Sequence, residues 1–247
     1  MRTGQVLMIV VTGISFLAGC IRDEIPLEID AAIRDAYDTY MNNVPLARKK
    51  RAAMSQKIAS IGDPNIRLAC NRRCIRMYLN IDPERIELRH RGRYLCDVIG
   101  HGFRMADSGL FHGEKKEAAL DDLLELLSYV RRHARKLKAA VQAMPTGEEG
   151  RRIKDCGAYA AYLDAEKGYN AVAVGYEIYL LKMERDDLPY VIRDLTEDTK
   201  ARLKKKFEDF LGRPMRTPEQ CIMDHKNRKA TEFPRISNSE AKSFGTW

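Results

Sequence analysis

The sequence contains no apolar stretch long enough to cross a membrane, because its apolar opening, Val6 to Leu17, spans about a dozen residues and a membrane helix needs roughly 20. It shows no internal repeat. Neither a serine-nucleophile motif nor a cysteine–histidine signature is present, so the common hydrolytic mechanisms lack their reacting groups. Glu87 and His90 form a single E-x-x-H pair, whereas a di-iron bundle needs two.

The opening of the chain instead carries the parts of an export signal. Arg2 is followed by the apolar segment and then by small residues before a cysteine, as in a secretory signal peptide. The four residues Leu17-Ala18-Gly19-Cys20 resemble the lipobox of bacterial lipoprotein precursors, a resemblance that covers only the first twenty residues. It implies that residues 1–19 are removed, that the Cys20 thiol receives a diacylglyceryl group, and that the new amine is acylated.

This resemblance also implies a place in the cell. Several acyl chains on Cys20 would anchor the protein durably, since a single chain is marginal. Ile21 follows the cysteine in place of the aspartate that retains many enterobacterial lipoproteins in the inner membrane. By similarity to that rule we expect a protein of the outer membrane that faces the periplasm, with residues 20–29 as a tether.

Basic residues outnumber acidic ones, with 43 Lys and Arg against 35 Asp and Glu and a net charge of +8. An exported protein rarely meets nucleic acid, so anionic lipid headgroups or an acidic envelope glycan are the more natural counter-charges. The densest basic clusters are residues 48–51 and 131–138. The helical spacing around residues 48–51 also fits the solvated face of an amphipathic helix.

Five cysteines remain if Cys20 carries lipid, and an oxidising periplasm favours disulfides between them. The odd number allows at most two bridges and one free thiol, and the connectivity stays open. The disulfide candidates are Cys70, Cys74, Cys96, Cys156 and Cys221.

Helical spacing of apolar residues predicts an all-α fold, an irregular multi-helix bundle over residues 30–212. We expect Gly92, Gly100 and Gly102 to loosen the helix that follows Pro83, and residues 144–150 to form a break between subdomains. Residues 169–183 fit a helix, although a small β-hairpin near 171–195 is the alternative. A short helix and a loose tail are predicted for residues 213–247.

The longest predicted helix spans residues 114–144. Leu120, Leu127, Ala134 and Val141 recur every seven residues, and a second apolar series runs beside them, as in a bundle or coiled-coil helix. Core packing explains this pattern, but so would a protein partner or self-association through the same face.

Candidate catalytic residues are few. Asp97 and His101 stand one helical turn apart and could form an oriented general base, with Cys96 beside them. Cys70, Cys74, Cys96 and His101 have a spacing that zinc could use, but we expect oxidised thiols there and therefore neither a metal site nor a cofactor. The sequence thus favours a non-enzymatic binding or scaffolding lipoprotein, with an enzyme or metal-binding protein centred on Asp97, His101 and Cys96 as the alternative.

Overall fold

The computed structural model describes residues 25–107, 115–144, 156–185, 196–226 and 232–236. These residues form helices and connections with no strand among them, which confirms the predicted all-α fold. No helix in these ranges is long and apolar enough to cross a membrane. The helices are α2 (Leu27–Asp38), α3 (Val44–Ala59), α4 (Pro64–Leu79), α5 (Leu88–Asp107), α6 (Lys115–Gln142), α8 (Cys156–Arg185), α9 (Glu197–Leu211) and α10 (Pro218–Lys226), with short 3-10 turns at Thr39–Met41 (η1) and Pro83–Arg85 (η2).

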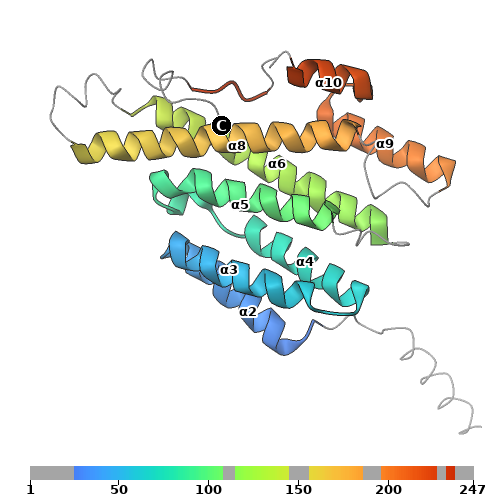
Figure 1. Ribbon diagram of the computed structural model, residues 1–247, viewed down its shortest axis with the longest axis horizontal. Helices are drawn as coiled ribbons and strands as arrows, with labels where there is room; N and C mark the ends of the chain where they lie inside the picture. Colours follow the sequence, from blue (N-terminus) through green and yellow to red (C-terminus); the bar gives the residue numbers. More distant parts are fainter. Residues whose placement is uncertain (1–24, 108–114, 145–155, 186–195, 227–231, 237–247) are drawn as a thin grey trace, which may run out of the picture.

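The helices are stacked across the molecule roughly in chain order (Figure 1). The pair α2 and α3 lies at one side, α4 and α5 follow, and α6 and α8 lie beyond them, with α9 and α10 at the opposite side. One apolar core extends through these helices, from Ile29 on α2 to Phe207 on α9. Tyrosine is prominent in this core, where the rings of Tyr37 and Tyr78 meet edge to face with centroids 4.5 Å apart.

The helix ends follow ordinary capping chemistry. Asn43 accepts a hydrogen bond from the backbone N–H of Leu46, 3.0 Å away, and Asp63 accepts one from Asn65 at 2.7 Å. Gly212 ends α9 with φ of 70°, the left-handed conformation that glycine adopts without strain. The first helix begins at Leu27, directly after Pro26, and so takes in part of the predicted tether.

Helix α5 continues through all three glycines that were expected to loosen it. The glycines are contact points: a Cβ added at Gly92 would lie 2.3 Å from the backbone of Gly168 on α8. Further along, a Cβ at Gly175 would lie 3.8 Å from the Ile99 side chain and one at Gly102 would lie 3.8 Å from the Tyr179 hydroxyl, both ordinary contacts; positions that ascend along α5 thus meet positions that ascend along α8, and the two helices run parallel. The prediction of a loosened segment was wrong because glycine also permits close helix packing.

Helix α8 is continuous from Cys156 to Arg185, which excludes the alternative hairpin over residues 171–185; residues 186–195 lie outside the described ranges. Its buried residues recur at helical spacing, so tertiary packing overrides the strand preference of valine and tyrosine. They include Tyr169, Val172, Tyr176, Tyr179 and Met183.

Helix α6 confirms the predicted heptad helix. Both apolar series face the chain's own core; Met144, the last member, is partly buried, and seven others are at most 1% exposed. These residues are Leu120, Leu123, Leu127, Val130, Ala134, Leu137 and Val141. Their side chains are therefore not available to a second chain in this structure.

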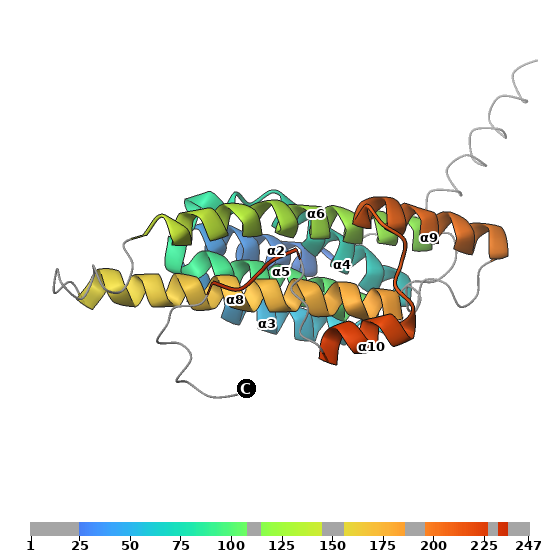
Figure 2. The same cartoon turned by 90° about the horizontal axis from the view of Figure 1, so that it is seen from above.

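The segment Glu232–Ile236, which we call the strap, lies against α8 and is not loose (Figure 2). Phe233 is only 4% exposed and meets the ring of Tyr176 edge to face at 5.2 Å. Tyr169 donates a hydrogen bond to the Pro234 carbonyl, and the Asn170 amide exchanges two with the backbone of Ile236, all at 3.0 Å. The prediction of a loose tail was wrong for these residues. The predicted signal peptide, Cys20 and most of the predicted break at 144–150 lie outside the described ranges.

Candidate functional site

A cleft of about 500 Å³ lies where α6, α8, the α9–α10 connection and the strap meet. Four arginines and two glutamates contribute to its wall, so arginine dominates its charge. The lining residues are Arg131, Arg135, Tyr176, Glu177, Leu180, Leu211, Arg213, Arg216 and Glu232.

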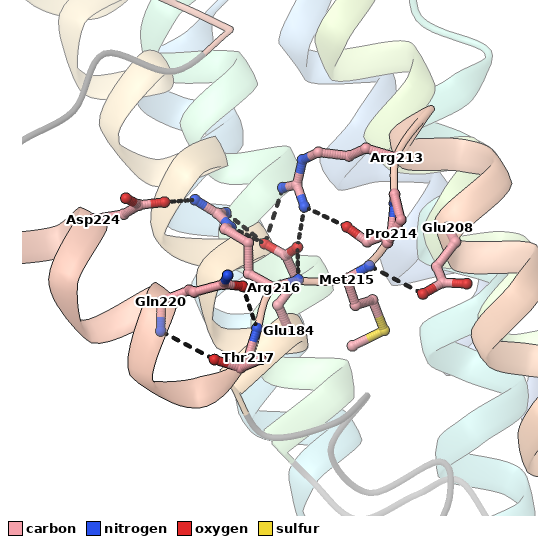
Figure 3. Close-up of polar contacts among 9 residues, drawn as sticks. All are labelled: Glu184, Glu208, Arg213, Pro214, Met215, Arg216, Thr217, Gln220 and Asp224. Carbon is pink, nitrogen blue, oxygen red and sulfur yellow. Dashed lines mark hydrogen bonds and ion pairs between the residues drawn. The ribbon is translucent and has the colours of Figure 1, made fainter.

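Two of the cleft arginines, Arg213 and Arg216, are held by Glu184, whose side chain is completely buried at the end of α8 (Figure 3). Arg213 donates to both of its carboxylate oxygens at 2.5 and 3.1 Å. Arg216 adds its Nε at 2.9 Å, its Nη2 at 2.5 Å and its backbone N–H at 3.1 Å. Burial raises the pKa of Glu184, but the hydrogen bonds from the two arginines outweigh burial and hold the pKa below its ordinary value. The carboxylate is therefore ionised at neutral pH.

Further contacts fix the connection that carries these two arginines. Arg216 also donates to Asp224 on α10 at 3.0 Å, and the Met215 backbone donates to Glu208 on α9 at 3.0 Å. Thr217 and Gln220 cap the start of α10 through reciprocal bonds of 2.9 and 3.3 Å. Residues 212–217 are thus held at several points, and both guanidinium groups are positioned before any ligand arrives.

The other wall is formed by α6 and the strap. Arg131 donates to the Tyr176 hydroxyl at 2.9 Å, and its guanidinium lies 4.3 Å from the centre of the Phe210 ring. Arg131 and Arg135 both contact the same carboxylate oxygen of Glu232, at 3.0 and 2.7 Å. The strap therefore presents a carboxylate of this chain to two of the four cleft arginines.

This arrangement suits anion recognition. Arg135 is 65% exposed and Arg213 is 40% exposed, so both guanidinium groups can reach solvent from opposite walls. Each guanidinium carries five N–H donors in a planar fork that matches carboxylate and phosphate oxygens. Burial raises the pKa of Tyr176 to about 12, so its hydroxyl stays protonated near neutral pH. The arginines and the protonated Tyr176 hydroxyl can therefore donate hydrogen bonds to an anion.

The predicted catalytic aspartate lies elsewhere, in a buried network between α3 and α5. Asp97 is 5% exposed and accepts hydrogen bonds from Tyr40 at 3.1 Å, Arg48 at 3.0 Å and Arg51 at 3.2 Å. Two guanidinium groups and a hydroxyl thus already engage this carboxylate. The 48–51 basic cluster, predicted as a solvated face, contributes both of its arginines to this network.

His101 and Cys96 share the same region but not an open site. His101 is 2% exposed and its ring lies 5.8 Å from that of Tyr78. Burial raises the pKa of the Cys96 thiol to about 11, which disfavours the nucleophilic thiolate. Within the described residues, no three of Cys70, Cys74, Cys96 and His101 bring their ligand atoms together.

The predicted disulfides are absent among the four cysteines whose side chains the structure describes. Cys70, Cys74 and Cys221 are buried, and the sulfur of Cys74 faces the thioether of Met54 at 3.9 Å. Burial also raises the pKa of Cys70 to about 11. These thiols behave as small apolar core groups, and the side chain of Cys156 lies outside the described part of the chain.

No family model, curated protein or solved structure matches this chain. The site must therefore be interpreted from its own geometry. The sequence indicates the basic cluster at 131–138, which supplies Arg131 and Arg135, but carries no signal for Glu184, Arg213 or Arg216. These three stand at helix ends and in a connection, where periodicity carries no signal.

Proposed function

We propose that this protein is a lipid-anchored protein of the bacterial cell envelope that binds an anionic ligand without catalysing a reaction. In this proposal Cys20 carries the lipid, and the helical body faces the periplasm from the outer membrane. The lipobox residues support the anchor. The observation that carries the binding function is the convergence of four arginines on one cleft.

The electrostatics of the cleft favour a ligand that carries a carboxylate or phosphate. Glu184 already neutralises part of the charge of Arg213 and Arg216, and Glu232 does so for Arg131 and Arg135. Arg135 and Arg213 remain open to solvent and can add further charge-assisted hydrogen bonds. Glu232 is 28% exposed, so an incoming anion can compete with it for the same donors.

The ligand class that fits an envelope location is an acidic glycan or an anionic lipid headgroup. Both present phosphate or carboxylate groups, which is the shared chemistry that arginine recognises. The alternative of a protein partner bound through the seam of α6 has less support, since that seam is filled by the chain's own core.

Two substitutions on α6 test the binding proposal. Arg135→Gln removes an exposed cleft guanidinium, whereas Arg132→Gln removes the same charge from an exposed position beside the Tyr129 ring, outside the cleft lining. We expect Arg135→Gln to weaken binding by about tenfold, the value of one charge-assisted hydrogen bond, and Arg132→Gln to change it little. Equal losses of affinity in both variants would show that binding depends only on the net charge of the protein and would contradict binding in the cleft.

The probes for this test are a carboxylated oligosaccharide (oligogalacturonate) and vesicles of phosphatidylglycerol mixed with phosphatidylcholine. Calorimetry with the first and co-sedimentation with the second distinguish a glycan from a lipid headgroup. Binding of neither probe at low salt would refute the proposed function.

The anchor has a separate test. Intact mass spectrometry of protein from its host should show cleavage before Cys20 and the added mass of the acyl chains. A Cys20→Ser chain should lose both and leave the membrane fraction. A native chain that retains residues 1–19 and an unmodified thiol would refute the anchor.

A further inference from the structure

A second group of polar residues lies away from the cleft, where the α4–α5 connection meets α6. Asp82 and Glu84 come from the connection, and His133 comes from the middle of α6. One ligand atom of each of these side chains lies within 4.8 Å of the other two. The His133 Nδ1 is 3.8 Å from Glu84 Oε1, too far for a hydrogen bond.

The histidine nitrogen that faces these carboxylates is buried and lacks a partner. The His133 side chain is 9% exposed, and its Nδ1 makes no hydrogen bond within the described part of the chain. A buried polar atom without a partner is costly and calls for an explanation, such as an ion. Burial and the charges of Arg132 and Lys136 lower the pKa of His133, so the ring is neutral near pH 7 and offers a lone pair.

The surrounding structure holds the backbone of the connection and the imidazole of His133 in place. Asp82 accepts a hydrogen bond from the Glu84 backbone at 3.0 Å, and Arg91 binds the carbonyls of Ile86 and Glu84 at 2.8 and 2.5 Å. The Tyr129 ring packs on the imidazole of His133 at 4.5 Å. These contacts fix the backbone of the connection and limit the rotation of the ring.

The hydroxyl of Tyr129 also fixes the connection to α6, because it donates a hydrogen bond to the carbonyl of Ile81, the residue before Asp82, at 2.7 Å. The side chains of Asp82 and Glu84 are exposed and can adjust. The site therefore combines one fixed nitrogen with two adaptable oxygens.

We propose that Asp82, Glu84 and His133 together bind one divalent metal ion of the zinc class. One imidazole nitrogen and two carboxylate oxygens form a ligand set that Zn²⁺ accepts, at roughly 2.0–2.2 Å from each. Ligand atoms at those distances around one ion lie about 3–4 Å apart, so small rotations of the two carboxylates close the set. The exposure of both carboxylates leaves room for water as a further ligand.

Lys136 shows that this position attracts positive charge, because its ammonium group pairs with the same Glu84 oxygen that faces His133. Lys136 is 54% exposed and can swing away when an ion arrives. It competes with the metal, so its removal should strengthen binding. The bound ion would connect the α4–α5 turn to α6.

The test uses the full chain, purified with a chelator and then titrated with Zn²⁺ and Co²⁺. Calorimetry should show one binding site per chain, and thermal unfolding should shift to higher temperature with Zn²⁺. His133→Phe and Glu84→Gln should each weaken binding by at least about tenfold, while Lys136→Gln should strengthen it. His90→Gln, which changes a histidine on α5 outside the group, is the matched control.

The Co²⁺ spectrum separates this site from the cysteines. A nitrogen and oxygen ligand set gives no sulfur-to-cobalt charge-transfer band, so its appearance with the bound ion would overturn the proposal. Unchanged affinity in both His133→Phe and Glu84→Gln would overturn it as well. Glu84→Gln alters an exposed side chain, which keeps the test valid if His133→Phe folds poorly.

Discussion

The close approach of α5 and α8 makes Gly92 the most tightly packed glycine among the described residues. A methyl group at Gly92 would lie 2.3 Å from the carbonyl carbon, 2.4 Å from the Cα and 2.7 Å from the oxygen of Gly168. Carbon atoms make favourable contact at about 3.5–4.0 Å, so the helices would have to separate locally by more than about 1 Å. Backbone atoms cannot rotate aside as the end of a side chain can.

Separation at this point affects the buried residues on both sides of it. Tyr94 and Leu95 on α5 and Tyr169 and Val172 on α8 are all fully buried, and a gap of 0.5–1 Å forfeits roughly a quarter to a half of each dispersion contact. We expect Gly92→Ala to destabilise the fold by about 3–4 kcal/mol, at or above the upper end for overpacked cores. The midpoint of thermal unfolding should fall by about 10 °C for a chain of this size.

Two other glycines provide internal controls. A Cβ at Gly100, on the same helix, meets nothing within 4 Å, so Gly100→Ala should gain about 0.5–1 kcal/mol from helix propensity. A Cβ at Gly168 would lie 3.1 Å from the Gly92 Cα, so the effect of Gly168→Ala on the free energy of unfolding should lie between those of Gly92→Ala and Gly100→Ala. Thermal and urea unfolding of the full chain, followed by circular dichroism, measures all three. Equal stability of Gly92→Ala and Gly100→Ala would refute the backbone contact between α5 and α8.

Three further predictions concern the polar network and the strap. Glu184→Gln should cost about 3 kcal/mol at pH 7, because it leaves two guanidinium groups without their carboxylate. The pKa of Glu184 is lowered in the folded state, so its stabilisation is present above the unfolded value of about 4.3 and is lost as the pH falls through the folded value. Urea unfolding at several pH values should show the gap to wild type closing below about pH 4, and a constant gap would contradict this reasoning. Asp97→Asn should lower the free energy of unfolding by a similar amount, since Arg51, which would lose its carboxylate, is only 11% exposed. If this variant instead lost an activity while keeping its stability, Asp97 would have a catalytic role. Phe233→Ala should cost only about 1–2 kcal/mol, less than a typical core phenylalanine, because the strap can detach without unfolding the bundle. Limited proteolysis should then cut near the strap first; uniform resistance would show that the strap is held by other contacts.

Helices were predictable because their signals are local and periodic. The seven-residue spacing of leucine, valine and alanine identifies α6 and its buried face without any knowledge of its neighbours. Asp63 before Pro64 and Thr196 before two acidic residues mark helix starts in the same way. The glycines of α5 led to a wrong prediction because glycine can either break a helix or let two helices pack closely. Only the position of α8 distinguishes these two roles.

The cleft was not predictable for a different reason. Its members are far apart in the chain: Glu184 binds Arg213 across 29 residues, and Arg135 binds Glu232 across 97. No pattern within a single helix indicates that residues so far apart in the chain are in contact. Asp97 and His101 attracted attention because they are neighbours in sequence, yet Asp97 is engaged by Arg48 and Arg51 from another helix. Short spacing alone is therefore a poor guide to chemistry in a helical bundle.

The parallel register of α5 and α8 restricts how related chains can change in length. Gly92 lies against Gly168, Gly175 against Ile99 and Gly102 against Tyr179, so the offset between the two helices stays nearly constant over three turns. Insertion of one residue inside either segment would rotate everything beyond it by about 100° and carry a bulky side chain into the crossing point. Related chains should therefore vary in length outside these two segments and keep small residues where the backbones meet.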